Sequence, residues 1–343
     1  MKLLKSEALR PYLALSLIFN VSPVNAELVQ HTVSKHTESL MNETQNDQVV
    51  AKVCAIILKH SLKKDIDAES IQVFTSLKDQ QGLTELKKKI LQFVQKSQPI
   101  AFTLVGFPFK SGNKDRKVIG ILADQAERHA LENLEEFLED IHKVHKHGAK
   151  LTIYTDGLSF FDLLGIPLKD LLAYEKSLKE LAADLPFISI MNCQDLFPGQ
   201  SLERIHKYIK DQVVPFKPLT SDEKQVLGKR LLKELDHPKG KSLLKKASLE
   251  KLVQDMHHRS RQINHIYKSK FPPAIHLSVH YQKDLGKKVG ISLSSGSITP
   301  WHGVAVLNKE GSFNIKQKED LSKNSRLCSK RINGLTCHYY IEE

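Results

Sequence analysis

The sequence predicts an α/β fold with a parallel sheet, and three stretches lead to that prediction. The run from Ile100 to Phe107 is short, apolar and rich in β-branched and aromatic residues, which is typical of a buried strand. Apolar residues then recur at helical spacing between Asp124 and Gly148. Residues 150–155 alternate like a second strand and end at an Asp-Gly turn. Strand, helix and strand in this order form a βαβ unit.

The rest of the chain adds helices before this unit and a mixed region after it. Helical spacing over residues 27–97 indicates a helical cap, and we expect the core to occupy residues 98–310. A helix over 168–183 and a strand over 187–191 continue the α/β pattern. Residues 202–270 are lysine-rich with helical periodicity, which indicates a helical insertion. Strand-like runs follow at 274–280, 289–294 and 303–308, and residues 311–343 have the pattern of a polar, peripheral C-terminal extension.

The charge of the chain is positive but evenly spread. The 343 residues carry a formal net charge of +12, with 41% hydrophobic and 26% charged residues, as in an ordinary globular protein. A basic chain suggests nucleic-acid binding, because Lys and Arg neutralise phosphates. Here the lysines are distributed through helical segments and no nucleic-acid motif is present. We therefore expect no nucleic-acid partner, and instead a field that attracts a small anionic substrate.

The four cysteines do not suggest a metal site or a disulfide framework. They stand far apart without any C-x-x-C pair, at positions 54, 193, 328 and 337. This spacing predicts no metal centre and fits a reducing compartment. We therefore expect a cytoplasmic protein.

The amino terminus allows a different localisation. Residues 1–26 contain basic residues, the apolar run LALSLIFNV and then SPVNA, which resembles a secretory signal peptide. Glu7 stands in what would be the positive region, and the apolar run is short. Export remains the alternative to the cytoplasm. No other stretch approaches the roughly 20 apolar residues of a membrane span, so no membrane partner is expected.

Several motifs recur in an order that points to one family. FPFKS-x-N follows the first strand, D-x-x-E-R begins the helix, and GA-K-L-T-I-x-x-D-G and F-x-D-LLG follow. PPAIHLSVH and TPWHGVAV come near the carboxyl end. In these motifs the sequence resembles the isonitrile (isocyanide) synthase family, which also includes dityrosine-forming proteins of the fungal spore wall. The matching parts run from Ile100 to Ala182 and from Phe271 to Val306.

The resemblance implies a fold and a reaction. It implies a Rossmann-like core and an enzyme of secondary metabolism that converts the α-amino group of tyrosine or tryptophan into an isonitrile. Ribulose 5-phosphate would donate the carbon, no metal or redox cofactor would be needed, and an Fe(II)/2-oxoglutarate oxygenase would be a downstream partner. Two alternatives stay open. One is an enzyme that formylates the nitrogen of tyrosine, and the other is a non-catalytic protein that binds anions or nucleic acid.

The loop after the first strand is a candidate anion site. It contains Lys110, Ser111, Asn113, Lys114 and Arg116, and its backbone N–H groups can also face an anion. It lacks the P-loop pattern, and a solvent-exposed basic turn is the simpler interpretation. With the resemblance, Lys110 becomes the first choice for binding a phosphate or carboxylate. An imine between this lysine and the ketose is the second choice.

The start of the long helix carries three charged residues on one face. Asp124 is a good N-cap residue and Glu127 stands where a capping-box partner would, so capping explains both without chemistry. Capping does not explain Arg128, whose planar guanidinium suits a carboxylate or phosphate. We expect Arg128 to anchor a ligand and Glu127 to be its partner or an acid/base group.

The remaining candidates follow later strands. Asp156 stands in an Asp-Gly turn, a common turn pair, but the resemblance makes it a candidate for binding the substrate ammonium or for general-base catalysis. His280 is a proton-transfer candidate, whereas His276 stands where relatives carry Arg. Trp301 packs in the core or forms a wall for an aromatic substrate, and His302 contacts the sugar or acts as acid or base.

These side chains come from separate parts of the sequence. Ligands of open α/β sheets bind beyond the carboxyl ends of the strands. We therefore expect Lys110, Arg128, Asp156, His280 and His302 to converge on one cavity there.

Overall fold

The computed structural model describes residues 44–61, 80–211, 218–271, 273–280 and 285–342. The signal-like segment over residues 1–26 and the first part of the predicted helical cap lie outside the described residues. Within the described part of that cap, residues 44–61 form a helix and α4 spans Gln80–Gln95.

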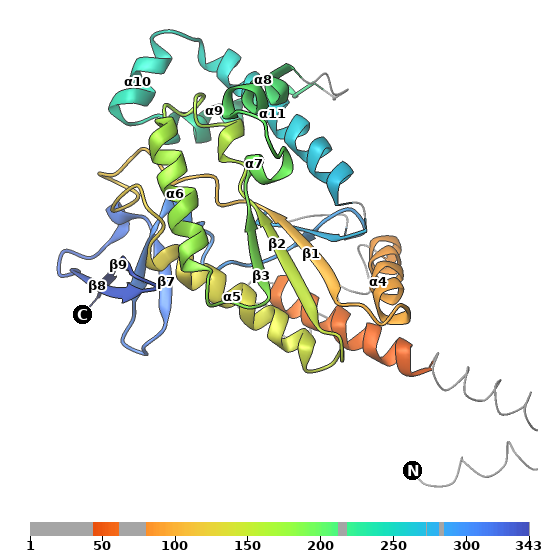
Figure 1. Cartoon of the computed structure of the whole chain (residues 1–343). Coiled ribbons are helices and arrows are strands. Elements are labelled where there is room, and N and C mark those ends of the chain that lie inside the picture. The colour runs from red at the N-terminus through yellow and green to blue at the C-terminus, as the bar shows by residue number, and fades with distance from the viewer. Residues whose placement is uncertain (1–43, 62–79, 212–217, 272, 281–284, 343) are drawn as a thin grey trace, which may run out of the picture.

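In the described residues a five-stranded parallel sheet forms the core (Figure 1), which confirms the predicted α/β class. Its order is β3-β2-β1-β4-β5, so the chain starts in the middle, moves to one edge and then returns to the other side of β1. The switch point between β1 and β4 is where such sheets bind ligands. The strands are β1 (Ile100–Val105), β2 (Ala149–Tyr154), β3 (Ile188–Met191), β4 (Ile275–Ser278) and β5 (Val289–Gly290).

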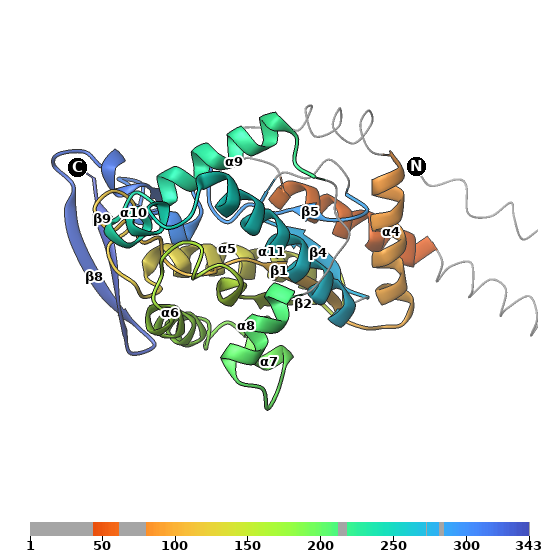
Figure 2. The ribbon, with the colours of Figure 1, turned by 90° about the horizontal axis from the view of Figure 1, so that it is seen from above.

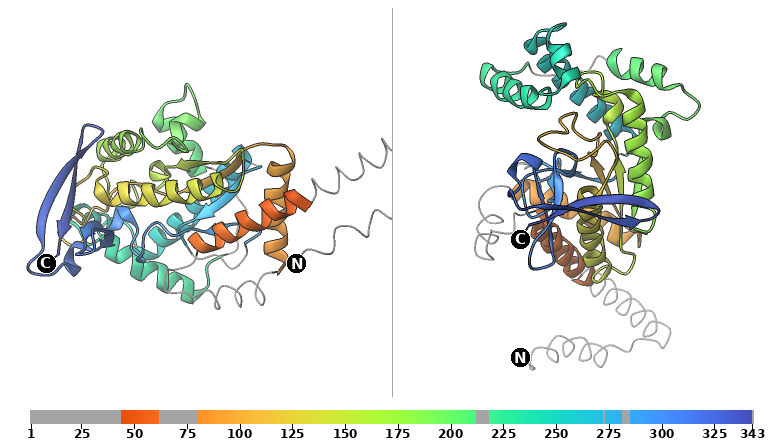
Figure 3. Two further views of the ribbon diagram at one scale, coloured as in Figure 1. Left: turned by 90° about the horizontal axis from the view of Figure 1, so that it is seen from below. Right: turned by 90° about the vertical axis from the view of Figure 1, so that its left-hand side faces the viewer.

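Two helices make the first crossovers of the sheet. α5 (Gln125–His142) joins β1 to β2, and α6 (Leu168–Leu181) joins β2 to β3. The apolar stripe of α5 is fully buried, as its periodicity predicts, and helix 44–61 lies beside it (Figure 3). There the rings of His60 and Phe137 are 5.4 Å apart. This face of the sheet is therefore closed by packed helices.

The lysine-rich region forms helices that cover one end of the sheet (Figures 1 and 2). Arg259 donates to the carbonyl oxygen of Ser159, just after β2, at 3.0 Å and pairs with Asp162. Since Ser159 follows the carboxyl end of β2, the helices cover the ligand-binding end. The helices of this region are α8 (Leu202–Asp211), α9 (Ser221–Glu234), α10 (Pro238–Leu244) and α11 (Leu249–Lys270), and the short α7 (Cys193–Leu196) precedes them.

The last part of the described chain builds a second sheet, in the order β7-β6-β9-β8. The sequence interpretation placed a peripheral extension after residue 310, but the strands formed there pair with β6. Ala305 and Ile315 of this sheet pack against Ala126 of α5. The strands are β6 (Val304–Leu307), β7 (Phe313–Lys316), β8 (Arg326–Ile332) and β9 (Leu335–Ile341), and the 3-10 turns are η1 (Gly157–Ser159), η2 (Pro300–His302) and η3 (Lys318–Asp320).

Candidate active site

The loops after β1 and β2 and the η2 turn meet at the carboxyl end of the sheet. Ser111 N donates to Trp301 O at 2.9 Å, and the rings of Phe107 and Trp301 are 5.1 Å apart. The turn after β2 lies equally close, because a Cβ on Gly157 would stand 2.1 Å from the carbonyl oxygen of Pro108. The predicted Asp-Gly turn therefore needs glycine for close packing, and the packing fixes Asp156 beside the loop after β1.

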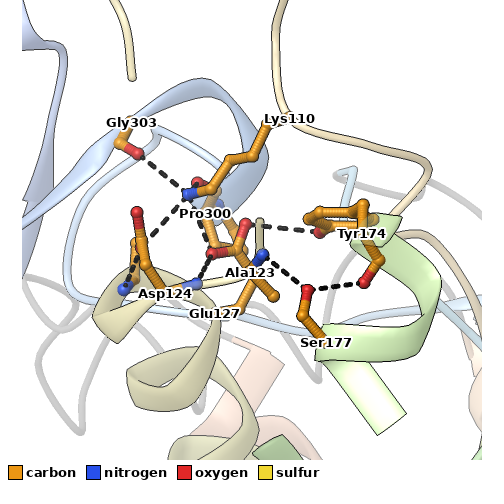
Figure 4. Close-up of polar contacts among 9 residues, drawn as sticks. Lys110, Ala123, Asp124, Glu127, Tyr174, Ser177, Pro300 and Gly303 are labelled. Atoms are coloured by element: carbon orange, nitrogen blue, oxygen red, sulfur yellow. Dashed lines mark hydrogen bonds and ion pairs between the residues drawn. The ribbon is translucent and has the colours of Figure 1, made fainter. Parts of the chain in front are cut away.

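Lys110 lies inside this junction with its side chain 1% exposed (Figure 4). Its ammonium is 2.8 Å from Glu127 Oε2, and it donates to Asp124 Oδ1 at 3.2 Å and to Pro300 O at 3.1 Å. It also donates to Gly303 O at 3.5 Å, so the three N–H donors of the ammonium are engaged by four protein acceptors. The sequence assigned Lys110 to a phosphate or carboxylate of the substrate. The structure instead engages it with protein groups that join the loop, α5 and η2.

Asp124 and Glu127 form the predicted capping box of α5. Asp124 Oδ1 accepts from Ala126 N at 2.9 Å, and Glu127 Oε2 accepts from Asp124 N at 3.0 Å. Tyr174 of α6 donates to Glu127 Oε1 at 3.2 Å. Burial raises the pKa of Glu127 to about 8, with Lys110 opposing the shift and Asp124 adding to it. The helix N-terminus that could have received an anion is thus occupied by the protein's own carboxylates.

Arg128 does not join this cluster. Its guanidinium donates to Glu132 Oε1 at 2.7 Å, to Leu181 O at 2.8 Å and to Asp184 Oδ2 at 3.0 Å. Asn333, in the turn between β8 and β9, also donates to Asp184, at 2.8 Å. The arginine that the sequence assigned to a substrate anion therefore links α5, the end of α6 and the second sheet.

A second polar cluster gathers around Glu234, the last residue of α9. Its Oε2 accepts from Ser111 Oγ at 3.1 Å and lies 3.4 Å from His302 Nε2, and its Oε1 pairs with Lys117. Thr299 Oγ1 is 2.9 Å from the other ring nitrogen of His302. Burial lowers the pKa of His302 although Glu234 opposes that shift. The insertion thus supplies a carboxylate to the site, and sequence analysis did not identify it.

The loop after β1, called the basic loop below, has most of its positive charge neutralised by acidic side chains of the protein. Asn113 Oδ1 accepts from Arg116 N at 3.1 Å, which shapes the turn, and Arg116 pairs with Asp236 at 3.3 Å. Lys114 lines a cavity of about 350 Å³ together with Lys239 and other residues of the loop, the segment before α6, and α10. Asp115 and Asp170 also line it, so the cavity carries both signs of charge.

A third polar group lies at the ends of β2 and β4, beneath α11. Asp156 Oδ1 is shut off from solvent and has no hydrogen-bond partner in the described chain. Burial raises the pKa of Asp156 to about 7, although the charge of Lys288 opposes the shift. Burial lowers the pKa of His280, and the charges of Arg230 and Lys288 lower it further. The charge of Lys288 therefore acts on the pKa of both Asp156 and His280.

Comparisons with known proteins identify the family of this chain. The profile of the family described as pyoverdine/dityrosine biosynthesis protein matches residues 90–243 and 223–328, which together are more than half of the chain. The chain belongs to that family. The prediction drawn from the motifs is therefore confirmed at the family level.

Relatives of this pyoverdine/dityrosine biosynthesis family member include named isonitrile synthases. An L-tyrosine isonitrile synthase of Pseudomonas aeruginosa is 28% identical over 273 residues, covering 73% of this chain and 82% of that protein. An L-tryptophan isonitrile synthase of Fischerella ambigua is 26% identical over 249 residues, covering 67% and 77%. The crystal structure of the PvcA protein from Pseudomonas aeruginosa matches with a TM-score of 0.70 at 25% identity, covering 86% and 99%. These similarities support an isonitrile synthase function.

Within the family fold, the candidate residues separate into three neighbouring groups. Lys110, Asp124 and Glu127 form a buried ion cluster, Ser111 and His302 surround Glu234, and Asp156 lies with His280 near Lys288. Trp301 is 6% exposed, packs on Phe107 and accepts from Ser111 N, which places it between the loop after β1 and His302. Arg128 lies apart, and Asn113 acts within its own turn.

Three residues of these groups were missed by sequence analysis: Lys117, Glu234 and Lys288. The first two form one ion pair across more than a hundred positions of sequence, so no local pattern signals it. His276, which the sequence left without a role, is 2.8 Å from Thr103 Oγ1, and burial lowers its pKa to about 4.

Neither a metal cluster nor a membrane span is found in the described ranges. No group of three or more potential His, Cys, Asp or Glu ligands gathers among these residues. None of the helices in the same ranges has both the length and the apolar composition that a transmembrane segment requires.

Proposed function

We propose that the chain converts the α-amino group of an aromatic L-amino acid, tyrosine or tryptophan, into an isonitrile, with ribulose 5-phosphate as the carbon donor. Family membership and the isonitrile synthases among the relatives support the reaction class. The observation that carries the proposal is the polar group at the switch point, where Asp156 and His280 follow β2 and β4. An active site of this fold is expected at that position.

The reaction needs groups that move protons. The substrate ammonium must lose a proton before its nitrogen can attack the C2 ketone, and a proton must be supplied when the carbinol oxygen leaves as water. With a pKa of about 7, the Asp156 carboxyl exists in both protonation states near neutral pH, so it suits both steps. His280, kept neutral by burial, is the second proton-transfer group. Cleavage of the C1–C2 and C2–C3 bonds of the sugar then leaves C2 on nitrogen, with C1 departing as formaldehyde and the C3–C5 phosphate fragment departing with a proton in place of its bond to C2.

The other groups hold this arrangement or bind the sugar phosphate. We assign the phosphate to the cavity beside the basic loop, where Lys114 and Lys239 supply donors. His302, fixed between Thr299 and Glu234, lies at the border between this loop and the switch point. Lys110 and Glu127 have a structural role. Lys110 pairs with Glu127 and donates to Pro300 O, which fixes the η2 turn that carries Trp301 and His302.

The proposed chemistry uses ribulose 5-phosphate as co-substrate and no metal or redox cofactor. A chelator such as EDTA should therefore leave turnover unchanged. We also propose a downstream Fe(II)/2-oxoglutarate oxygenase that consumes the isonitrile. Turnover that disappears with the chelator and returns with added metal would contradict the cofactor assignment.

The test is incubation of the purified protein with ribulose 5-phosphate and each aromatic amino acid, followed by mass spectrometry. An isonitrile is expected, and a product heavier by one water would instead identify the N-formyl compound. Asp156→Asn should lower kcat by a factor on the order of 10² to 10⁴, the usual contribution of an acid/base group. Asp255→Asn is the matched control, because Asp255 is a solvent-facing α11 carboxylate paired with Lys251.

A further inference from the structure

Two side chains of opposite charge lie near each other at the switch point without forming an ion pair. Asp156 Oδ1 is enclosed and has no hydrogen-bond partner in the described chain. Lys288, half-buried just before β5, donates from Nζ to the amide oxygen of Asn264 on α11 at 2.6 Å. The two charges are close enough to influence each other's pKa. Asn264 stands one turn before Tyr267 on α11, and the ring of Tyr267 is 5.4 Å from that of Tyr154, two residues before Asp156, so α11 holds the Lys288 ammonium toward the end of β2.

This separation is unfavourable in the absence of a ligand. A buried charge is destabilising unless it is paired and hydrogen-bonded. Direct contact between the two groups would give each charge a partner and remove this destabilisation. The structure does not show that contact: Asp156 follows β2, whereas Lys288 precedes β5, beyond β1 and β4 in the strand order, and bonds to Asn264 instead. A ligand that carries an ammonium at one end and a carboxylate at the other would satisfy both.

We propose that Asp156 and Lys288 are the two poles of the binding site for the amino-acid zwitterion: Asp156 accepts from the α-ammonium, and Lys288 donates to the α-carboxylate. This inference rests on the proposed function, because it places the amino group beside the groups that move its proton. It assigns the carboxylate to a residue outside the motifs that define the resemblance.

The other basic candidates are less suited to the carboxylate. Lys110 is held by Asp124 and Glu127, and Arg128 is held by Asp184 and Glu132, so a substrate would have to displace protein carboxylates. Lys288 would only have to share its ammonium with the Asn264 amide. It retains N–H donors for a second acceptor, since an ammonium has three.

Aromatic side chains lie beside the proposed site, where an aromatic substrate would benefit from them. The ring of Tyr267 on α11 is 5.4 Å from Tyr154 at the end of β2 and 5.2 Å from Phe271. It is also 5.7 Å from His276, on the strand that pairs with β5. Ring faces at such distances pair favourably with a further ring. Tyr154 and Tyr267 are 0% and 3% exposed, so these rings belong to the buried core next to the two charged groups.

The test is a set of calorimetric titrations with three ligands: the amino acid, the amine that lacks its carboxylate, and the acid that lacks its amino group. For tyrosine these are L-tyrosine, tyramine and 3-(4-hydroxyphenyl)propanoate. Lys288→Met should weaken binding of the amino acid and the acid by about ten- to a hundredfold, as expected for loss of one charge-assisted hydrogen bond, and leave tyramine unaffected. Asp156→Asn should weaken the amino acid and tyramine and leave the acid unaffected. If the tyrosine set does not bind, the matching tryptophan set is used.

Controls separate a binding role from a structural one. Lys251→Met removes an exposed lysine of α11 and should leave all three affinities unchanged. Lys288→Arg keeps the charge and should retain most of the affinity. Equal weakening of all three ligands by Lys288→Met, or no weakening of any, would overturn the proposal, as would a parent protein that binds neither aromatic amino acid.

The outcome also separates this inference from the proposed function. If the parent forms isonitrile and Lys288→Met binds and turns over the amino acid normally, the zwitterion clamp fails and the function stands. If the ligand pattern appears as expected but no isonitrile forms from either amino acid, the clamp stands and the function fails.

Discussion

Among the candidate residues, Lys110 in the loop after β1 differs most from its predicted role, because its side chain is buried against protein groups. A sequence motif cannot distinguish a lysine that faces a substrate from one that faces a capping box. Lys110 is within reach of Asp124 and Glu127, with Pro300 O as a further acceptor (Figure 4). Asp124 and Glu127 were predicted to cap α5 and do so. The contact of Lys110 with these two carboxylates was not predicted. It forms only because the fold brings residue 110 back to the start of α5.

Removing that lysine should destabilise the fold. Lys110→Met leaves two carboxylates at the start of α5 without their cation, and breaking a buried ion pair by removing one partner typically costs about 3–5 kcal/mol. Urea denaturation measures this loss. Lys88→Met, at an exposed lysine paired with Glu85, should change the free energy of unfolding by less than about 0.5 kcal/mol. Equal effects of the two substitutions would mean that the buried cluster adds no stability.

The raised pKa of Asp156 predicts a pH dependence of stability. The folded chain keeps the proton up to about pH 7, whereas the unfolded carboxyl, with its ordinary pKa of 3.8, loses it at lower pH. The folded state then binds more protons, so this group lowers stability as pH rises between these values. The stability of Asp156→Asn relative to the parent should therefore increase from pH 4 to pH 7 and level off above it. A constant difference across this range would contradict the assignment.

At the scale of elements, the insertion does more than cover the sheet. The last residue of α9 binds the basic loop through Ser111 and Lys117 and also approaches His302. The loop and α10 are so close that a Cβ on Gly112 would stand 2.6 Å from the ring of His237. The strands and helices that frame this contact were predicted from periodicity. The contact itself joins residues far apart in sequence, so periodicity could not predict it.

Breaking this contact should loosen the basic loop. Glu234→Ala leaves the buried ammonium of Lys117 without its carboxylate, so backbone amides over residues 108–118 should exchange hydrogen for deuterium several-fold faster. Mass spectrometry of the exchanged peptides measures this change. Asp236→Asn alters a neighbouring carboxylate that pairs with Arg116 and Lys241 near the surface, and it should have a much smaller effect. Unchanged exchange in Glu234→Ala would show that the loop is held by other contacts.

At the scale of the whole molecule, the second sheet completes the core. Residues 311–343 were expected to be peripheral because they are basic and polar, and the sequence of β8 lacks the apolar alternation of a buried strand. The structure nevertheless pairs β9 with β6 and buries Cys337 and Ile315. The five parallel strands had clearer apolar runs, which explains why the α/β class was predictable and this sheet was not.

Shortening the chain tests this role. A chain that ends at residue 310 loses β7 and β9, which pair with both edges of β6, and uncovers the apolar cluster on α5. Exposed strand edges promote aggregation. The shortened chain should therefore be recovered mainly in the insoluble fraction, or unfold at least several degrees below the parent by thermal denaturation. A shortened chain that is soluble and as stable as the parent would instead show that residues 311–343 are a dispensable extension.

The most direct test of the central claim compares turnover by the parent and by Asp156→Asn under identical conditions. Each is incubated with ribulose 5-phosphate and the preferred aromatic amino acid, and isonitrile is quantified by mass. The account predicts isonitrile from the parent and at least a hundredfold slower formation by Asp156→Asn, with Asp255→Asn unchanged. Isonitrile formation by Asp156→Asn at the parental rate would contradict it.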